Sequence, residues 1–329
     1  MYNVYQHWDP LKLCIVGKSY PPEFYSFIKD SKVRNVFEKI ASETEEDYQS
    51  LIKLLGSLGV ESIRPEIGND INQYFDGKKY ISPPMVPRDY MSMVGNEFHF
   101  NDGGYKHCYT DLLNRVSAQG NTIKYETGIN GASTTRVGKD LYFGTTMGTV
   151  VIDNGQYESL FPNYRTHVID TQGHSDATFC PVTPGLIISL HDIPAYKDTF
   201  PDWEVIYLPG QSWGAIPEFQ KLKERNRGKW WVPGEELNNE FTDYIESWMS
   251  HWTGYVEETV FDVNMLVVDK KNVICNNYNK DVFDAFSRYG ITPHICNFRH
   301  RYFWDGGLHC ITSDLHREGV MEDYFPDRQ

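Results

Sequence analysis

A helix, a glycine and a strand follow one another near the start of this sequence, and their return near its end restricts the fold more than any other feature. Apolar residues recur at the spacing of one helix face, which predicts an amphipathic helix over 44–58. Gly59 suits the end of that helix, and the apolar residues of 60–64 predict a strand directly after it.

The same order returns where a predicted helix over 281–289 precedes Gly290 and a predicted strand over 291–297. Short apolar segments between the two ends predict further strands, and 269–272 predicts a hairpin turn. The strand candidates are 11–16, 90–94, 141–145, 167–170, 186–190, 204–208, 265–268 and 273–275. This repetition indicates an α/β domain of similar modules, and no linker divides the chain.

The charge of the chain limits its partners. Its 329 residues include 45 acidic and 31 basic side chains, which gives a formal net charge of −14. Binding to phosphate backbones or to anionic lipid needs clustered Lys and Arg. No apolar run reaches the roughly 18 residues that cross a bilayer, and residues 1–10 do not resemble a signal peptide. We expect a cytoplasmic protein that binds neither nucleic acid nor a membrane.

The six cysteines are scattered and form no Cys-x-x-Cys pair, which favours free thiols over a disulfide framework. The spacing of His99, His107 and Cys108 matches no common zinc site, so no metal is expected there. The segment 210–214 fits G-x-S-x-G, but Pro217 follows too early for the helix that a serine nucleophile needs. Six tryptophans lie between residues 203 and 252, where packing is favoured over a lid.

Three clusters carry residues suited to chemistry. The first contains Pro87-Arg88-Asp89, and the second places His174 two residues before Asp176, so that both share a face if the segment is extended. The third brings Cys310 close behind paired glycines at 306 and 307. A thiolate can attack, a histidine can move protons, and carboxylates can hold a planar cation by charge-assisted hydrogen bonds.

In this order the three clusters resemble signatures of the guanidino-group modifying enzymes, and most closely those of their amidinotransferase branch. The resemblance covers about residues 85–320 and includes the segment 264–269. It implies a five-bladed α/β propeller of pseudo-fivefold ββαβ modules, forming a single catalytic domain over 1–329. Residues 211–257 look like a Trp-rich insertion in this pattern.

By this resemblance, Cys310 attacks the guanidinium carbon of an arginine-like donor and holds the amidino group as a covalent adduct. A small amine acceptor then takes the amidino group. His174 exchanges protons with the leaving and accepting amines, and Asp89 and Asp176 bind the guanidinium nitrogens. The resemblance implies no metal and no organic cofactor, and it is compatible with a homodimer.

One position departs from the family pattern. Aligning the chain on the segment 136–140 places Asn130 where relatives carry an acid that orients the histidine, here His174. An amide can accept a hydrogen bond from imidazole, but it does not stabilise imidazolium by charge. We therefore expect slower proton transfer or a substitute carboxylate such as Glu126, and Asn130→Asp is expected to raise turnover.

A second departure concerns the α-carboxylate of the donor. Where amidinotransferases place a carboxylate-binding arginine this chain has Ile193, and the other carboxylate-binding region holds Glu257 and Glu258. Either other cations bind the carboxylate, or the donor lacks one. The candidates are Arg165, Arg299, Arg301 and Arg136, and the pair Arg299 and Arg301 would also suit a phosphorylated acceptor.

Two other functions remain open from the sequence. In the first, water replaces the acceptor amine, which gives an arginine or agmatine deiminase. In the second, the chain has lost catalysis and binds a guanidino ligand or a protein partner. Asn130 favours this second alternative, whereas Cys310, His174, Asp89 and Asp176 argue for an active enzyme.

Overall fold

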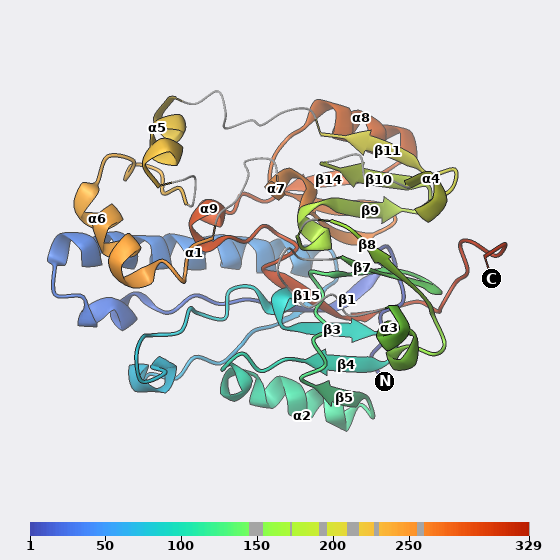
Figure 1. Cartoon of the computed structure of the whole chain (residues 1–329), viewed down its shortest axis with the longest axis horizontal. Helices are drawn as coiled ribbons and strands as arrows, with labels where there is room; N and C mark the ends of the chain where they lie inside the picture. Colours follow the sequence, from blue (N-terminus) through green and yellow to red (C-terminus); the bar gives the residue numbers. More distant parts are fainter. Residues whose placement is uncertain are drawn as a thin grey trace.

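The computed structural model describes residues 1–144, 154–171, 173–190, 196–208, 217–226, 230–254 and 260–328. Its described strands form five sheets of three strands each (Figure 1). In every sheet the first two strands pair antiparallel, and the third pairs parallel with the second. A parallel third strand needs a crossover, and a helix supplies it in each blade. The pseudo-fivefold ββαβ propeller that the resemblance implied is confirmed.

One blade joins the two ends of the chain, because its strands are β15 (Thr312–Arg317), β1 (Leu11–Val16) and β2 (Glu61–Ile63). The other four blades follow in chain order. They are β3 (Met91–Val94), β4 (Glu97–Phe100) and β5 (Thr122–Tyr125); β6 (Thr134–Val137), β7 (Asp140–Gly144) and β8 (Arg165–Ile169); β9 (Phe179–Thr183), β10 (Leu186–Ser189) and β11 (Glu204–Tyr207); and β12 (Leu266–Asp269), β13 (Asn272–Cys275) and β14 (Thr292–Ile295).

The crossover helices of the blades are α1 (Ser31–Ser57), α2 (Thr110–Ala118), α3 (Asn154–Leu160), α4 (Tyr196–Thr199) and α8 (Lys280–Tyr289). The loops carry the shorter helices α5 (Pro217–Asn226), α6 (Asn239–Tyr244), α7 (Val260–Val263) and α9 (Arg301–Trp304). Single 3-10 turns also occur, of which η3 (Pro87–Asp89) and η5 (Ser175–Ala177) matter for the site. The others are η1 (Pro22–Phe27), η2 (Ile71–Tyr74) and η4 (Lys106–Tyr109), and a π-helical turn, η7, spans Ile245–Met249.

Helix α1 begins earlier than its sequence periodicity predicted. The side chain of Asp30 caps it by accepting hydrogen bonds from the backbone N–H groups of Lys32 and Val33. The buried face then continues through Phe37 and Ile40 into the predicted helix over 44–58. At the far end of the chain, Gly290 ends α8 with a φ of 68°, the left-handed conformation that glycine adopts without strain.

The Trp-rich insertion packs against α1 through its described residues. Trp230 and Trp252 are buried, and Trp230 meets Phe241 edge to face with ring centroids 5.5 Å apart. Phe241 in turn meets Phe37 of α1 at 5.3 Å, and α6 lies beside one end of α1 in Figure 1. The packing interpretation therefore holds for these residues but is wrong for Trp248, which is 69% exposed, and Trp213 lies outside the described ranges.

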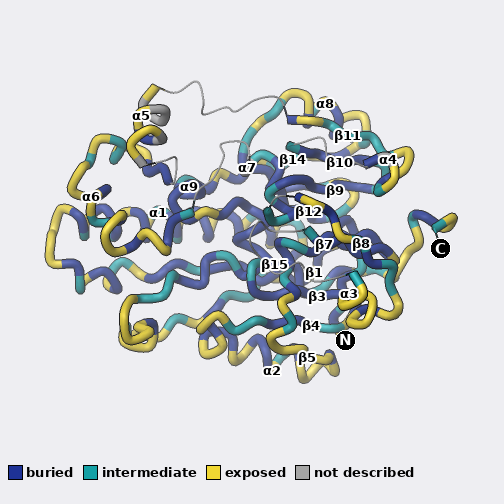
Figure 2. Tube along the Cα trace, in the orientation of Figure 1, coloured by how far each residue is buried: buried dark blue, intermediate teal, exposed yellow. Residues whose placement is uncertain are grey.

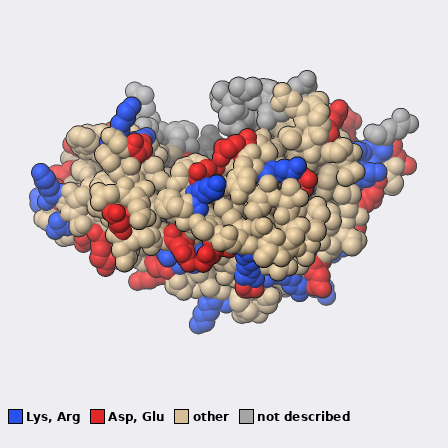
Figure 3. All heavy atoms as spheres, turned by 90° about the horizontal axis from the view of Figure 1, so that it is seen from below, with Lys and Arg blue, Asp and Glu red and all other residues tan. Residues whose placement is uncertain are grey.

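Many of the buried apolar residues lie on the strands of the blades. Strands β1, β9 and β10 are dark along most of their length in Figure 2, whereas α2 and α3 show exposed outer faces. On the face seen in Figure 3, acidic and basic side chains are interspersed, so no large patch of one sign forms there. Within the described ranges, no helix is both long enough and apolar enough to cross a membrane.

Candidate active site

The loops that precede the first strands of four blades each hold at least one of the predicted site residues. Asp89 precedes β3, Asn130 precedes β6, Asp176 precedes β9 and Cys310 precedes β15. Backbone hydrogen bonds link these loops, including those from Gly131 N–H to the Arg88 carbonyl at 2.8 Å and from Asp176 N–H to the Ala132 carbonyl at 3.1 Å. Pseudo-fivefold repetition thus gathers segments that are far apart in the sequence.

Cys310 lies at the centre of this arrangement with 9% of its surface exposed. Its thiol donates towards Asp176 Oδ2 across 3.5 Å, and the side-chain amide of Asn264 donates to its Sγ across 3.1 Å. Burial raises the pKa of the Cys310 thiol well above its ordinary value, and the charges of Asp176 and Asp89 act in the same direction. The site without a substrate therefore holds a protonated thiol.

His309, the residue before the cysteine, binds Asp176. Its Nδ1 lies 2.8 Å from Asp176 Oδ2, and burial together with the charge of Arg88 lowers the pKa of His309 to about 4. A neutral imidazole therefore donates its N–H to this carboxylate. Burial alone would raise the pKa of Asp176, but the bond from His309 and neighbouring positive charge hold it below its ordinary value.

His174 faces a group of carboxylates. Burial lowers its pKa, but the charges of Asp89, Asp176 and Asp305 outweigh this effect and raise the pKa above its ordinary value. Burial in turn raises the pKa of Asp89 to about 6, which the charge of His174 opposes. The buried oxygens Asp89 Oδ1 and Asp176 Oδ1 accept no hydrogen bond from the residues that the structure describes. These two oxygens can therefore receive hydrogen bonds from a bound cation.

Asp305 is a third carboxylate, directly before the paired glycines of the cysteine cluster, and no role for it was predicted from the sequence. It adopts a φ of 53°, and the backbone of Gly254 lies so close to its carboxylate that a side chain at that glycine would clash with it. Partial removal of water by the surrounding protein, followed by the smaller effect of the Asp89 charge, raises the pKa of Asp305 to about 7. Its side chain keeps accessible surface, so solutes can meet it.

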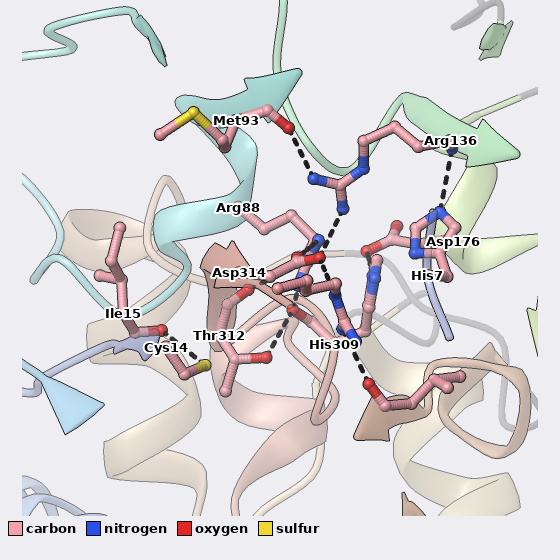
Figure 4. A network of polar contacts seen from close by, with 12 residues as sticks. His7, Cys14, Ile15, Arg88, Met93, Arg136, Asp176, His309, Thr312 and Asp314 are labelled. Atoms are coloured by element: carbon pink, nitrogen blue, oxygen red, sulfur yellow. Dashed lines mark hydrogen bonds and ion pairs between the residues drawn. The ribbon is translucent and has the colours of Figure 1, made fainter. Parts of the chain in front are cut away.

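Beneath the cysteine loop, three buried arginines surround one aspartate (Figure 4). Asp314 lies 2.8 Å from Arg88 Nη1 and accepts hydrogen bonds from Arg136 Nη2 at 2.9 Å and Arg317 Nε at 2.8 Å. Arg88 Nε also donates to the carbonyls of His309 and Thr312, at 2.7 and 2.8 Å. Because these carbonyls flank Cys310, Arg88 holds both sides of the cysteine loop.

The structure gives the other predicted residues different partners. Arg136 is buried and donates to Asp314 and to the Met93 carbonyl. Arg299 binds Asp47 and Glu46 of α1. Both guanidinium groups are thus occupied by protein partners.

Arg301, Arg165 and Asn130 are also engaged within the protein. Arg301 donates to Asn297, to Asn277 and to the Phe298 carbonyl. Arg165 binds Asp140 and Asp323. Asn130 Oδ1 accepts the Ser133 N–H at 2.8 Å, and Glu126 accepts the Asp102 N–H at 2.7 Å. Besides Asp89 and Asp176, the carboxylate that acts on His174 is therefore Asp305, and neither Asn130 nor Glu126 takes that role.

Several sequence candidates lie outside the described residues, namely the segment 210–214, Ile193 and the pair Glu257 and Glu258. No group of three potential metal ligands of the His, Cys, Asp or Glu type occurs in the part of the chain that the structure describes. His99 instead hydrogen-bonds Thr127 at 3.0 Å. The remaining five cysteines are buried and free, and burial raises the pKa of Cys14 and Cys180 to about 12.

Comparisons with known proteins agree with this geometry. No protein-family model matches the chain. Mitochondrial glycine amidinotransferases of Xenopus laevis and Gallus gallus are 22% and 24% identical to it, and each match covers 98% of this chain and 84% of the relative. An L-arginine:L-lysine amidinotransferase of Pseudomonas savastanoi pv. phaseolicola is 20% identical, with 98% and 96% coverage.

Solved structures show the same fold. An inosamine-phosphate amidinotransferase of Streptomyces griseus matches with a TM-score of 0.72 at 19% identity, over 98% of this chain and 99% of that one. An amidinotransferase of the saxitoxin pathway in Microseira wollei gives 0.71 at 18% identity with the same coverage. A dimethylarginine dimethylaminohydrolase gives a lower score of 0.58 at 11% identity, over 92% of this chain and 99% of that one.

Proposed function

Since the chain belongs to the amidinotransferase branch of the guanidino-group modifying enzymes, we propose that it moves an amidino group from an arginine-like donor to a small amine. Cys310 carries the group between the two as a covalent adduct. The observation that carries this proposal is the contact of 3.5 Å between Cys310 Sγ and Asp176 Oδ2, beside carboxylate oxygens that still lack a hydrogen-bond donor.

The donor guanidinium binds to Asp89 and Asp176. Each carboxylate has a buried Oδ1 without a hydrogen bond, and a planar cation with several N–H groups meets this need in a fixed geometry. The bound cation also neutralises the two charges that raise the pKa of Cys310. The thiol therefore releases its proton to solvent only after the donor has bound, and the thiolate and its substrate are then together in the site.

His174 handles the protons. Its raised pKa favours imidazolium in the free site, so it can protonate the donor amine as the C–N bond breaks. The neutral imidazole that results then removes a proton from the acceptor amine as that amine attacks the adduct. The acid that is consumed in the first step is thus regenerated in the second.

Mass spectrometry of Cys310 tests this function. After incubation with arginine, we expect a mass increase of one amidino group on Cys310, which disappears when an acceptor amine is added and reappears on that amine. Cys310→Ser is the control and must remain unlabelled. Wild-type protein that gains no adduct from any guanidino compound would overturn the proposal, and ammonia release without an amine would assign hydrolysis instead.

The form of the donor is tested by comparing arginine with agmatine, which lacks the α-carboxylate. Arg136 and Arg299 are occupied by acidic partners, and three carboxylates face the site. We expect agmatine to give a larger kcat/KM for adduct formation than arginine. A much larger value for arginine would show that the chain has another carboxylate-binding group.

The location and assembly of the protein stay predictions from the sequence. We propose a cytoplasmic homodimer, and light scattering of the purified protein tests the assembly. A monomeric mass over the working range of concentration contradicts it.

A further inference from the structure

Asn264 is a fully buried residue in the loop before β12, and no role followed for it from the sequence. Its Oδ1 accepts the backbone N–H groups of His309 at 2.9 Å and Cys310 at 3.1 Å. Its Nδ2 donates to the Asp176 carbonyl at 3.1 Å and to Cys310 Sγ at 3.1 Å. The Asn264 amide therefore contacts the Cys310 sulfur, the backbone of the cysteine loop and the segment that contains Asp176.

These partners fix the orientation of the amide. A backbone N–H can only donate, so the Asn264 atom facing His309 and Cys310 must be the oxygen. A carbonyl can only accept, so the atom facing the Asp176 carbonyl must be the nitrogen. The second N–H of the same nitrogen then points to Sγ, and an amide flip would lose the three hydrogen bonds to backbone groups.

Gly307 makes this approach possible. A Cβ atom at Gly307 would lie 2.5 Å from Asn264 Oδ1, closer than any ordinary contact. Only glycine therefore allows the amide to sit against the cysteine loop. Gly307, the second glycine of the predicted cluster, is thus required because a larger residue would displace Asn264.

The sulfur needs such a donor because its surroundings are negative. Asp176 Oδ2 lies 3.5 Å from Sγ, and Asp89 also acts on it. His309 is neutral and directs its N–H to Asp176 instead of the sulfur. The side-chain hydrogen bond from Asn264 is one of the few interactions that favour the charged thiolate.

We propose that Asn264 is a catalytic residue whose Nδ2–H donates to the Cys310 thiolate and stabilises it both as nucleophile and as leaving group. The part that concerns the leaving group rests on the proposed amidino transfer. The hydrogen bond to Cys310 Sγ does not, because it exists before any substrate binds.

The same hydrogen bond serves both half-reactions. In the first, the S–C bond forms, the C–N bond of the donor breaks and the departing amine takes a proton from His174. In the second, the acceptor N–C bond forms, the S–C bond breaks and His174 takes the acceptor's proton. The sulfur starts the first step and ends the second as a thiolate, so Asn264 lowers the barrier in both directions.

Alkylation of Cys310 by iodoacetamide tests the hydrogen bond without any guanidino substrate. Asn264→Asp keeps the oxygen that holds the cysteine loop but loses the N–H donor. A hydrogen bond to a charged group corresponds to a change of about 10- to 100-fold, so we expect alkylation at pH 8 to slow by that factor. At lower pH the introduced carboxyl group becomes protonated and can donate again, so the deficit should shrink.

A merely structural role predicts a different outcome. Because a carboxylate beside Sγ slows alkylation by its charge alone, the deciding variant is the uncharged Asn264→Ala, which would then alkylate as fast as the wild type at every pH, and this result overturns the proposal. Cys310→Ser supplies the background from the other five cysteines. If Asn264→Ala does not fold, wild-type alkylation rates in Asn264→Asp are equally contradictory.

The amidino steps are then measured separately. In the folded Asn264 variant, we expect both adduct formation and adduct release to an amine to slow by about the same factor as alkylation. A wild-type protein that forms no adduct refutes the proposed function but leaves the alkylation result standing. Slow alkylation combined with wild-type adduct kinetics contradicts the catalytic role of Asn264.

Discussion

Asp305 carries a carboxylate at a backbone position that favours glycine, since its φ is 53°. Its charge acts on His174 together with those of Asp89 and Asp176. The sequence placed Asn130 where relatives carry an acid, and the structure shows Asn130 Oδ1 bound to the Ser133 N–H. We therefore expect Asp305, in the cysteine loop, to replace the acid that relatives carry at position 130, although the two residues are far apart in the sequence.

Removing the charge of Asp305 should change the pH dependence of the reaction. Asparagine keeps the shape of the side chain and tolerates positive φ, so Asp305→Asn should fold. With less negative charge nearby the pKa of His174 falls, and the alkaline limb of adduct formation, which needs imidazolium, moves to lower pH. The rate of Cys310 adduct formation against pH measures this shift.

Asn130→Asp is the matched variant for this experiment. A carboxylate can still accept the Ser133 N–H, and Asn130 shows no contact with His174 among the described residues. From the structure we therefore expect Asn130→Asp to change turnover little, whereas the sequence predicted that it would raise turnover. A clear rise for Asn130→Asp, with no pH shift for Asp305→Asn, would assign the orienting charge to position 130.

Most strands, and the recurring order of helix and strand, could be predicted because short apolar segments recur along the chain and glycines mark the ends of two helices. Strands β1 and β10 and helix α8 lie within one residue of their predicted bounds. Strands β4, β5, β6, β9 and β15 were missed. Of these, β6 and β15 have the sequences Thr-Thr-Arg-Val and Thr-Ser-Asp-Leu-His-Arg. Both are buried through ion pairs and hydrogen bonds rather than through alternating apolar side chains, so periodicity gave no signal.

The site was predicted to the extent that its residues lie in recognisable clusters. His309 and Asn264 escaped because their roles depend on a distance of 2.8 Å to Asp176 and one of 3.1 Å to Cys310, across segments far apart in the chain. The arginine candidates were chosen for their charge alone. Sequence gives no sign that Arg136 directs its charge to Asp314 inside the core.

The element that holds the cysteine loop can be tested through Arg88, which joins η3 to the segment before β15. Arg88→Met leaves Asp314 with fewer partners and releases the His309 and Thr312 carbonyls. Breaking a buried ion pair costs about 3–5 kcal/mol, and we expect the free energy of unfolding in urea to fall by that amount.

Arg34→Met supplies the control for this substitution. Arg34 pairs with Glu38 on α1 at 3.4 Å, and both side chains are partly exposed. Such a pair contributes about 0–1 kcal/mol, so the unfolding curve should hardly move. Equal losses from Arg88→Met and Arg34→Met would contradict the structural importance of the buried cluster.

At the scale of the whole molecule, stability should fall in mild acid partly because of His99. Burial lowers its pKa to about 4 from 6.5. Between these values the unfolded chain binds a proton that the folded protein excludes, so stability is lost as the pH falls through this window. From pH 7 to pH 5 this corresponds to about 2 kcal/mol for one such group.

His99→Gln isolates this contribution, because glutamine can still bond Thr127 but does not titrate. The free energy of unfolding in urea at pH 7 and pH 5 should therefore decrease less for the variant than for the wild type. Asp89 and Asp305 have raised pKa values and act in the opposite direction in both proteins. Parallel decreases in the two proteins would show that His99 takes up a proton equally in both states.

The blade shared by the two ends of the chain has a consequence for the timing of folding. Strand β15 pairs with β1, and Cys310 lies just before β15. A ribosome releases residues in chain order, so four complete blades and an open partner strand exist before the nucleophile emerges. The thiol therefore meets Asp176 and Asn264 only when the ring closes, and a nascent chain that stops short of residue 312 has no assembled centre for the reaction.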